Sequence, residues 1–164
     1  VEKFHNPRGG RYAAGFWSMT THQGFGQRLG AMASGRVCGK AHANGASPYS
    51  GWDRLGPTAS LSAAANVVTP PNGYVINQKI SSEMVQGEVG NKILGGLVQG
   101  FFAKGGSQVQ FNILDSEVLQ AARKSPEDHR DLVVRISGYS AYFNDLTEEM
   151  KDELIARSLH GANA

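Results

Sequence analysis

A single glycine places the strongest constraint on this chain, because it interrupts a run of side chains that would otherwise pack together. Gly138 lies at the centre of the run 135–143, among isoleucine, tyrosine and phenylalanine residues. A glycine in such a run weakens the local structure, and it usually marks a special backbone conformation or a close backbone approach. One interpretation is a tight turn before Tyr139. The other is a chemical role that requires a residue without a Cβ.

The composition argues against several classes of partner. The chain has 164 residues, and its 21 glycines are nearly twice the average share of about 7%. The net charge is only +2 and the 16 Lys and Arg residues are scattered, which argues against nucleic acid as a partner. The sequence has no apolar run of the roughly 18 residues that a membrane span needs, and residues 1–5 lack a signal-peptide core. We therefore expect a cytoplasmic protein that binds neither nucleic acid nor membrane.

The spacing of apolar residues predicts a mixed α/β chain. The expected elements, in chain order, are a buried strand and polar turn within 15–22, a short helix over 60–66, a strand over 74–80, a helix over 82–102, a strand over 107–114, a helix from 115 or 116 to 124, and a final helix capped by Thr147. No internal repeat or low-complexity tract interrupts this series.

Five sequence features that precede or include the glycine occur in a fixed order. They are Gly105-Gly106, the strand Val109-Gln110-Phe111-Asn112, the helical stretch 115–124, the run Pro126-Glu127-Asp128-His129-Arg130-Asp131-Leu132, and Gly138. This order resembles the C-terminal domain of glycyl radical enzymes. The residues from Arg135 to Tyr139 are also similar to the Arg-Val-x-Gly-Tyr signature of that family.

The radical chemistry of this family gives a reason for glycine. Loss of a hydrogen atom from a glycine Cα leaves a planar radical that is conjugated with the amide nitrogen on one side and the carbonyl on the other. A Cβ would crowd this arrangement and restrict φ and ψ. The resemblance therefore implies that Gly138 is the catalytic residue that stores the radical. It also implies that Arg135, Ser137 and Tyr139 support the radical loop, with Arg135 anchoring it by hydrogen bonds and Tyr139 packing.

The same resemblance implies a fold and a division into domains. The expected fold class is α/β, namely the C-terminal portion of a ten-stranded α/β barrel that carries the glycyl radical domain. Residues 1–60 are expected to be the end of the pyruvate formate-lyase-like barrel domain, and residues 61–164 the glycyl radical domain. The chain is accordingly expected to be a C-terminal fragment of an enzyme large subunit.

The resemblance also implies partners rather than a bound cofactor. The glycyl radical is a post-translational modification, installed by a radical S-adenosylmethionine activase that carries an iron-sulfur cluster. Further expected partners are a small-molecule substrate, the remainder of the large subunit and other subunits of a homo- or hetero-oligomer. The five histidines show no metal-ligand spacing, so no metal site is expected.

The lone cysteine, Cys38, is too close to Gly138 in sequence to match the catalytic cysteine of the family. One cysteine also allows no internal disulfide. The surrounding run 34–40 is similar to a Gly-Arg loop that is not the thiyl-radical loop. We expect Cys38 to be a small structural residue. The cysteine that would receive the radical is therefore expected to lie outside this sequence.

Two short segments favour one branch of the family. Residues 15–22 and 77–79 are most similar to the benzylsuccinate and alkylsuccinate synthases, which add a hydrocarbon to fumarate with C–C bond formation. The alternatives are another glycyl radical enzyme, namely a diol dehydratase, a C–N lyase, an arylacetate decarboxylase or a formate acetyltransferase. The run 56–59 also occurs in the dehydratase, choline lyase and decarboxylase branches.

Other functional classes stay open or are excluded by motif. A stand-alone glycyl radical carrier protein would use the same glycine without being an enzyme itself. An ordinary α/β binding domain with an incidental Ser-Gly-Tyr is the third interpretation. Ser18, His22 and Asp53 could be combined into a hydrolase triad, but the chain has no Gly-x-Ser-x-Gly nucleophile elbow.

Overall fold

The chain forms helices and short strands in alternation, as the apolar spacing predicts. The computed structural model describes residues 3–66 and 70–159, so the expected outer domain bounds at 1 and 164 lie outside the described residues. The elements in chain order are α1 (Thr21–Arg28), α2 (Gly56–Ala65), β1 (Ile76–Ile80), η1 (Ser82–Val85), α3 (Gly87–Ala103), β2 (Val109–Ile113), α4 (Ser116–Lys124), η2 (Pro126–His129), β3 (Val133–Arg135), β4 (Ser140–Tyr142), η3 (Phe143–Asp145) and α5 (Glu148–Leu159). The fold is therefore mixed α/β.

Strands β1 and β2 form a two-stranded parallel sheet, connected through α3. Their register pairs Ile76 with Val109 and Ile80 with Ile113. Side chains in β1 alternate between buried and half-buried, with Ile76 and Ile80 on the buried face. This alternation explains why the strand could be predicted from the sequence.

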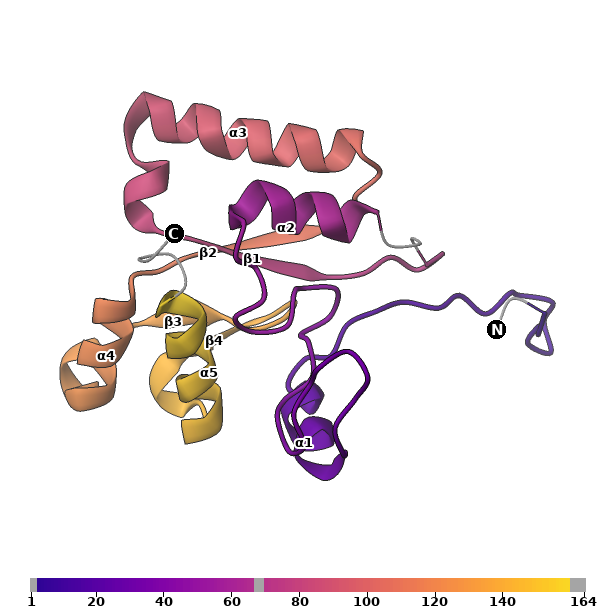
Figure 1. The fold of residues 1–164 in the computed structure, drawn as a ribbon, viewed down its shortest axis with the longest axis horizontal. Coiled ribbons are helices and arrows are strands. Elements are labelled where there is room, and N and C mark those ends of the chain that lie inside the picture. Colours follow the sequence, from indigo (N-terminus) through magenta and orange to yellow (C-terminus); the bar gives the residue numbers. More distant parts are fainter. Residues whose placement is uncertain (1–2, 67–69, 160–164) are drawn as a thin grey trace.

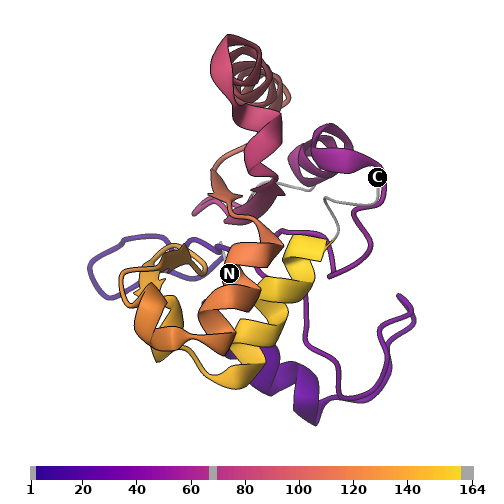
Figure 2. The ribbon, with the colours of Figure 1, turned by 90° about the vertical axis from the view of Figure 1, so that its left-hand side faces the viewer.

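Helices α2 and α3 cover the parallel sheet. In Figure 1, α2 lies between the strands and α3, and the turned view in Figure 2 again places both helices on the same side of the sheet. Their core joins residues from both helices and from β1 and its approach, namely Leu61, Ala64, Ala65, Tyr74, Ile76 and Phe101. Burial of these apolar side chains is the main force that holds the helices on the strands.

The second core lies around the β3–β4 hairpin. Helices α4 and α5 pack against each other and against the hairpin, and Figure 2 shows them side by side. The buried residues of this core are Leu119, Ala122, Val134, Ile136, Phe143, Met150 and Leu154. Because strand, loop and both helices contribute, the hairpin is held on one side by a continuous apolar cluster.

The buried strand expected within residues 15–22 is absent, whereas the expected turn is present at residues 19–20. Phe16, Trp17 and Met19 are 46%, 50% and 52% exposed, and Phe16 makes an isolated bridge to Tyr74 rather than part of a strand. The following residues form the short helix α1, which the sequence did not predict. The apolar residues here do not alternate with polar ones, and they form no strand ladder, so apolar content alone did not predict a strand correctly.

The expected helix over 82–102 is divided in two. A 3-10 turn, η1, ends before Gln86, and α3 begins at Gly87, which has φ +66°. A Cβ built on Gly90 would lie 2.1 Å from the carbonyl carbon of Val85, so the break allows a close backbone contact that only glycine permits. The predicted strand within 107–114 and the helix before Pro126 are confirmed.

Both predicted helix caps lie at helix starts, but they act differently. The Oγ1 atom of Thr147 accepts a hydrogen bond from the N–H of Met150 at 3.4 Å, as an N-cap should. Asp115 is the N-cap residue of α4, yet its side chain makes no capping bond. Its carboxylate instead accepts the hydroxyl of Ser82 at 2.6 Å and the N–H of Ser82 at 3.2 Å. Asp115 thus ties α4 to η1.

Candidate functional site

The candidate site is the loop at the tip of the β3–β4 hairpin. The two strands are antiparallel, with Val133 opposite Tyr142 and Arg135 opposite Ser140. The four loop residues are 136–139, and the N–H of Ile136 donates to the carbonyl oxygen of Tyr139 at 3.0 Å. The expected loop residues therefore lie together at one tight connection.

Gly138 has a backbone conformation that favours glycine. Its φ is +85°, in the left-handed region that L side chains rarely adopt. A Cβ built on it would meet no atom within 4 Å, and the residue is exposed. The structure therefore requires glycine for its backbone angle and leaves open space beside its Cα.

A side chain from the parallel sheet contacts the amide of Gly138. The N–H of Gly138 donates to Oε1 of Gln110 at 3.1 Å. Gln110 lies in β2 and is only 7% exposed. This contact links the loop tip to a different structural layer, 28 residues earlier in the chain. Sequence reasoning missed it, because Gln110 looked only like part of a strand.

The three residues predicted to support the loop have distinct environments. Ser137 is 4% exposed, and its Oγ has no hydrogen-bond partner among the described residues. The side chain of Tyr139 packs against the apolar cluster of the hairpin. The guanidinium of Arg135 is exposed and donates to Oγ of Ser140 at 3.0 Å, which connects the ends of β3 and β4.

Cys38 differs from the structural residue that the sequence suggested. Its thiol is free and the residue is exposed, so it does not fill a core position. The loop around it is held by Arg36, which is 4% exposed and donates to the carbonyl oxygen of Lys40 at 2.5 Å and to that of Gly30. The structural role in this loop therefore belongs to Arg36.

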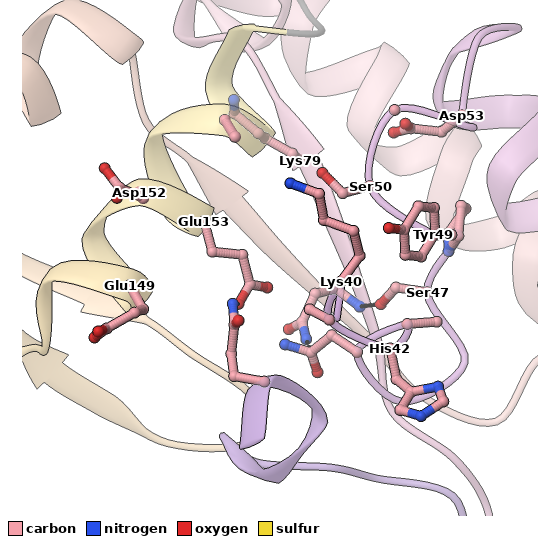
Figure 3. Close-up of a pocket in the computed structure, with 18 of the residues that line it drawn as sticks. Lys40, His42, Ser47, Tyr49, Ser50, Asp53, Lys79, Glu149, Asp152 and Glu153 are labelled. Atoms are coloured by element: carbon pink, nitrogen blue, oxygen red, sulfur yellow. Dashed lines mark hydrogen bonds between the residues drawn. The ribbon is translucent and has the colours of Figure 1, made fainter. Parts of the chain in front are cut away.

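A cavity of about 540 Å³, lined by both charged and apolar groups, lies between the N-terminal segment, β1 and α5. Figure 3 shows Glu149, Asp152 and Glu153 along α5 on one side and Tyr49, Ser50 and Asp53 on the other. At its edge, Nε2 of His22 lies 2.8 Å from Oε2 of Glu153, and Gln23 also donates to that carboxylate. The contact spans 131 residues, and no local sequence pattern signals it.

Two members of the rejected hydrolase triad do lie together, but not as a triad. Oγ of Ser18 is 3.3 Å from Nδ1 of His22, whose other ring nitrogen contacts Glu153 rather than Asp53. The Ser18 oxygen also donates to Oδ1 of Asn44 and accepts the N–H of Gly45. The serine is therefore engaged as a loop anchor.

Within residues 3–66 and 70–159, no group of three or more His, Cys, Asp or Glu side chains could hold a metal ion. No helix in the same described part of the chain is both long and apolar enough to span a bilayer.

Comparison with known proteins places this loop in a family. Residues 42–144 match the family model described as glycine radical. The chain is 39% identical over 151 residues to trans-4-hydroxy-L-proline dehydratase of Clostridioides difficile, covering 92% of this chain and 19% of that protein. Lyases and a decarboxylase match as well.

Solved structures agree with the sequence matches. The glycerol-bound B12-independent glycerol dehydratase of Clostridium butyricum has a TM-score of 0.91 and 38% identity, and a glycyl radical enzyme of Archaeoglobus fulgidus has 0.87 and 39%. Each match covers 96% of this chain and 20% of the other, so the chain spans about a fifth of the length of these relatives. The predicted fold class is confirmed. The chain belongs to the glycine radical family, whose members carry a radical on a glycine of this domain.

Proposed function

We propose that Gly138 stores an unpaired electron on its Cα and passes it to a cysteine outside this chain. The observation that carries the proposal is the open loop tip. Gly138 is exposed, its φ is +85° and no atom lies within 4 Å of a Cβ built on it. By contrast, a Cβ on Gly45, whose N–H also donates to a side chain, would lie 2.4 Å from the carbonyl oxygen of Val75. The direction that a Cβ would take is thus open at Gly138 and blocked at Gly45.

The neighbouring residues hold the loop and do not react. Arg135 joins the two strand ends, and Tyr139 packs onto the apolar cluster beneath the loop. Ser137 is buried beside the glycine. In this proposal, residues 61–164 act as the glycyl radical domain and residues 1–60 belong to the barrel.

An activase that carries an iron-sulfur cluster and S-adenosylmethionine removes the hydrogen atom from Gly138. The exposed position of the glycine supports such access. The radical then serves a cysteine of a full-length subunit, which reacts with a small-molecule substrate. Cys38 is not assigned this role, because its loop is similar to a different loop of the family.

The proposed reaction class is the elimination of water or another leaving group from a small polar substrate. Two of the proteins compared above are named as dehydratases. Fumarate addition, which residues 15–22 and 77–79 favoured, has no support from these relatives. We therefore take the dehydratase alternative.

Electron paramagnetic resonance tests the radical assignment. The protein is incubated without oxygen with an activase of a glycyl radical enzyme and S-adenosylmethionine, and we expect a doublet-like signal from one hydrogen on the radical carbon. Gly138→Ala should abolish this signal. Gly96→Ala is the matched control, because Gly96 is exposed in α3 and a Cβ there meets no atom within 4 Å. A doublet that persists in Gly138→Ala would refute the assignment.

A further inference from the structure

We propose that Gln110 is a positioning residue for the radical site. Its side-chain oxygen holds the amide of Gly138 and tunes how far the unpaired electron spreads into that amide. This inference rests on the proposed role of Gly138. It assigns a function to a strand residue that lies outside the hairpin and its loop.

The first argument is geometric. Oε1 of Gln110 lies 3.1 Å from the amide nitrogen of Gly138, which is within the normal range for an N–H···O hydrogen bond. The backbone of Gln110 is held in the parallel sheet, because β2 pairs along its length with β1 and Gln110 lies opposite Asn77. The rigid sheet therefore sets the position of the amide at the loop tip.

The second argument is energetic. Gln110 is the most buried residue of β2, although its neighbours Val109 and Phe111 are apolar. Its Nε2 is buried and has no hydrogen-bond partner among the described residues. Burial of an unpaired amide group is costly, and an apolar side chain would avoid this cost. A glutamine at this position is explained by the acceptor that it directs at Gly138.

The third argument concerns the radical itself. A Cα radical is stabilised when the flanking amide groups are coplanar with the radical centre, and a φ of +85° holds the amide far from that plane. The open space around Gly138 allows the backbone to flatten when the hydrogen atom leaves. A hydrogen bond accepted from the N–H of Gly138 makes the nitrogen a better electron donor, which draws spin density away from Cα.

The test compares three variants under the anaerobic activation described above. Gln110→Met keeps the length of the side chain and removes the acceptor, whereas Gln110→Glu keeps an acceptor. Gln120→Met is the matched control, because Gln120 is exposed on α4. The measurements are the number of spins per chain and the splitting of the doublet, with circular dichroism as a check of folding.

We expect Gln110→Met to hold fewer spins at equal activase, by at most about fivefold, because one net hydrogen bond is worth about 1 kcal/mol and part of it is already present before activation. Its doublet splitting should increase, because more spin density stays on Cα. Gln110→Glu should keep the splitting at or below that of the original protein, because a carboxylate is a stronger acceptor than an amide oxygen, and Gln120→Met should match the original protein. If Gln110→Met does not fold, Gln110→Asn takes its place, since it withdraws the acceptor by one methylene group and keeps a polar side chain.

The outcomes separate this inference from the proposed function. If the original protein gives no doublet, the proposed function fails. If the original protein gives the doublet and the acceptor-lacking variant shows the same splitting, the inference is overturned and the role of Gly138 stands. The inference is also overturned if the variant loses spins or stability without a change in splitting, because a residue that only holds the loop in place would not change the splitting.

Discussion

At position 138, both the backbone angle and the proposed radical chemistry favour glycine. The φ of +85° costs an L-amino acid about 1 to 2 kcal/mol, and glycine avoids this strain. A planar radical centre also requires a carbon without a side chain. Because the space beside Cα is empty, the loop excludes other residues by conformation and not by packing.

Asp115 gives a prediction about pH. Hydrogen bonds from Ser82, first from its hydroxyl and then from its N–H, lower the pKa of the Asp115 carboxyl below its usual range. A lowered pKa in the folded state adds stability above the unfolded pKa of about 3.9, and this stability is lost as the pH falls through the folded pKa. Asp115→Asn should therefore be less stable by about 1 kcal/mol at pH 7.

Urea unfolding at a series of pH values measures this effect. The difference in free energy of unfolding between the original protein and Asp115→Asn should shrink as the pH falls below about 4. A difference that stays constant from neutral to acidic pH would show that the charge of Asp115 is not involved.

Single residues differed in how far the sequence revealed them. Gly138 could be found because a glycine in an apolar run is unusual and because ordered motifs precede it. The proposed positioning role of Gln110 could not be predicted, because it depends on a contact between a strand residue and a loop residue that are 28 residues apart. The orientation of a strand side chain toward a distant loop is set by tertiary packing, which local patterns do not encode.

Between elements, a buried contact joins α1 to α5. His22 of α1 and Glu153 of α5 lie 2.8 Å apart, with side chains 1% and 11% exposed. Helix α5 also contributes Met150 and Leu154 to the core beneath the radical loop. The contact therefore joins the N-terminal segment to the helix that supports the hairpin.

Removal of one partner from this pair should be strongly destabilising. We expect Glu153→Ala to lower the free energy of unfolding by about 2 kcal/mol, because the variant removes a hydrogen-bond partner from the buried ring of His22. Amide hydrogen exchange in α1 should also accelerate. Asp152→Ala is the matched control on the same helix, since Asp152 forms an exposed pair with Arg123 and its loss should have a much smaller effect. Equal losses in the two variants would contradict the importance of the buried contact.

The elements themselves were predicted where periodicity was clear. The strand over 76–80 alternates, and the helix that begins at 148 follows its capping threonine. The strand predicted within 15–22 is absent, because the large apolar residues of this segment are mostly exposed in the described chain. The break at Gln86 was missed because Gly87 and Gly90 fit a helical spacing, although they serve a turn and a close backbone contact.

On the scale of the whole molecule, several large apolar side chains are exposed, as expected of a chain that spans only part of the length of its relatives. Phe16, Trp17, Phe25 and Trp52 are between 46% and 60% exposed. The chain covers about a fifth of the relatives that it matches. We propose that these side chains contact the remainder of a full-length subunit. The hairpin core, by contrast, draws its buried residues from β3, η3, α4, α5 and Ile136 of the loop, and it holds the loop that carries Gly138.

Cleavage by oxygen tests the central claim most directly. After anaerobic activation, the protein is exposed to air and its fragments are measured by mass spectrometry. A radical on Gly138 should react with oxygen and break the chain at that residue, and Gly138→Ala should stay intact under the same treatment. An activated protein that remains whole, or that breaks at another residue, would contradict the assignment of the radical to Gly138.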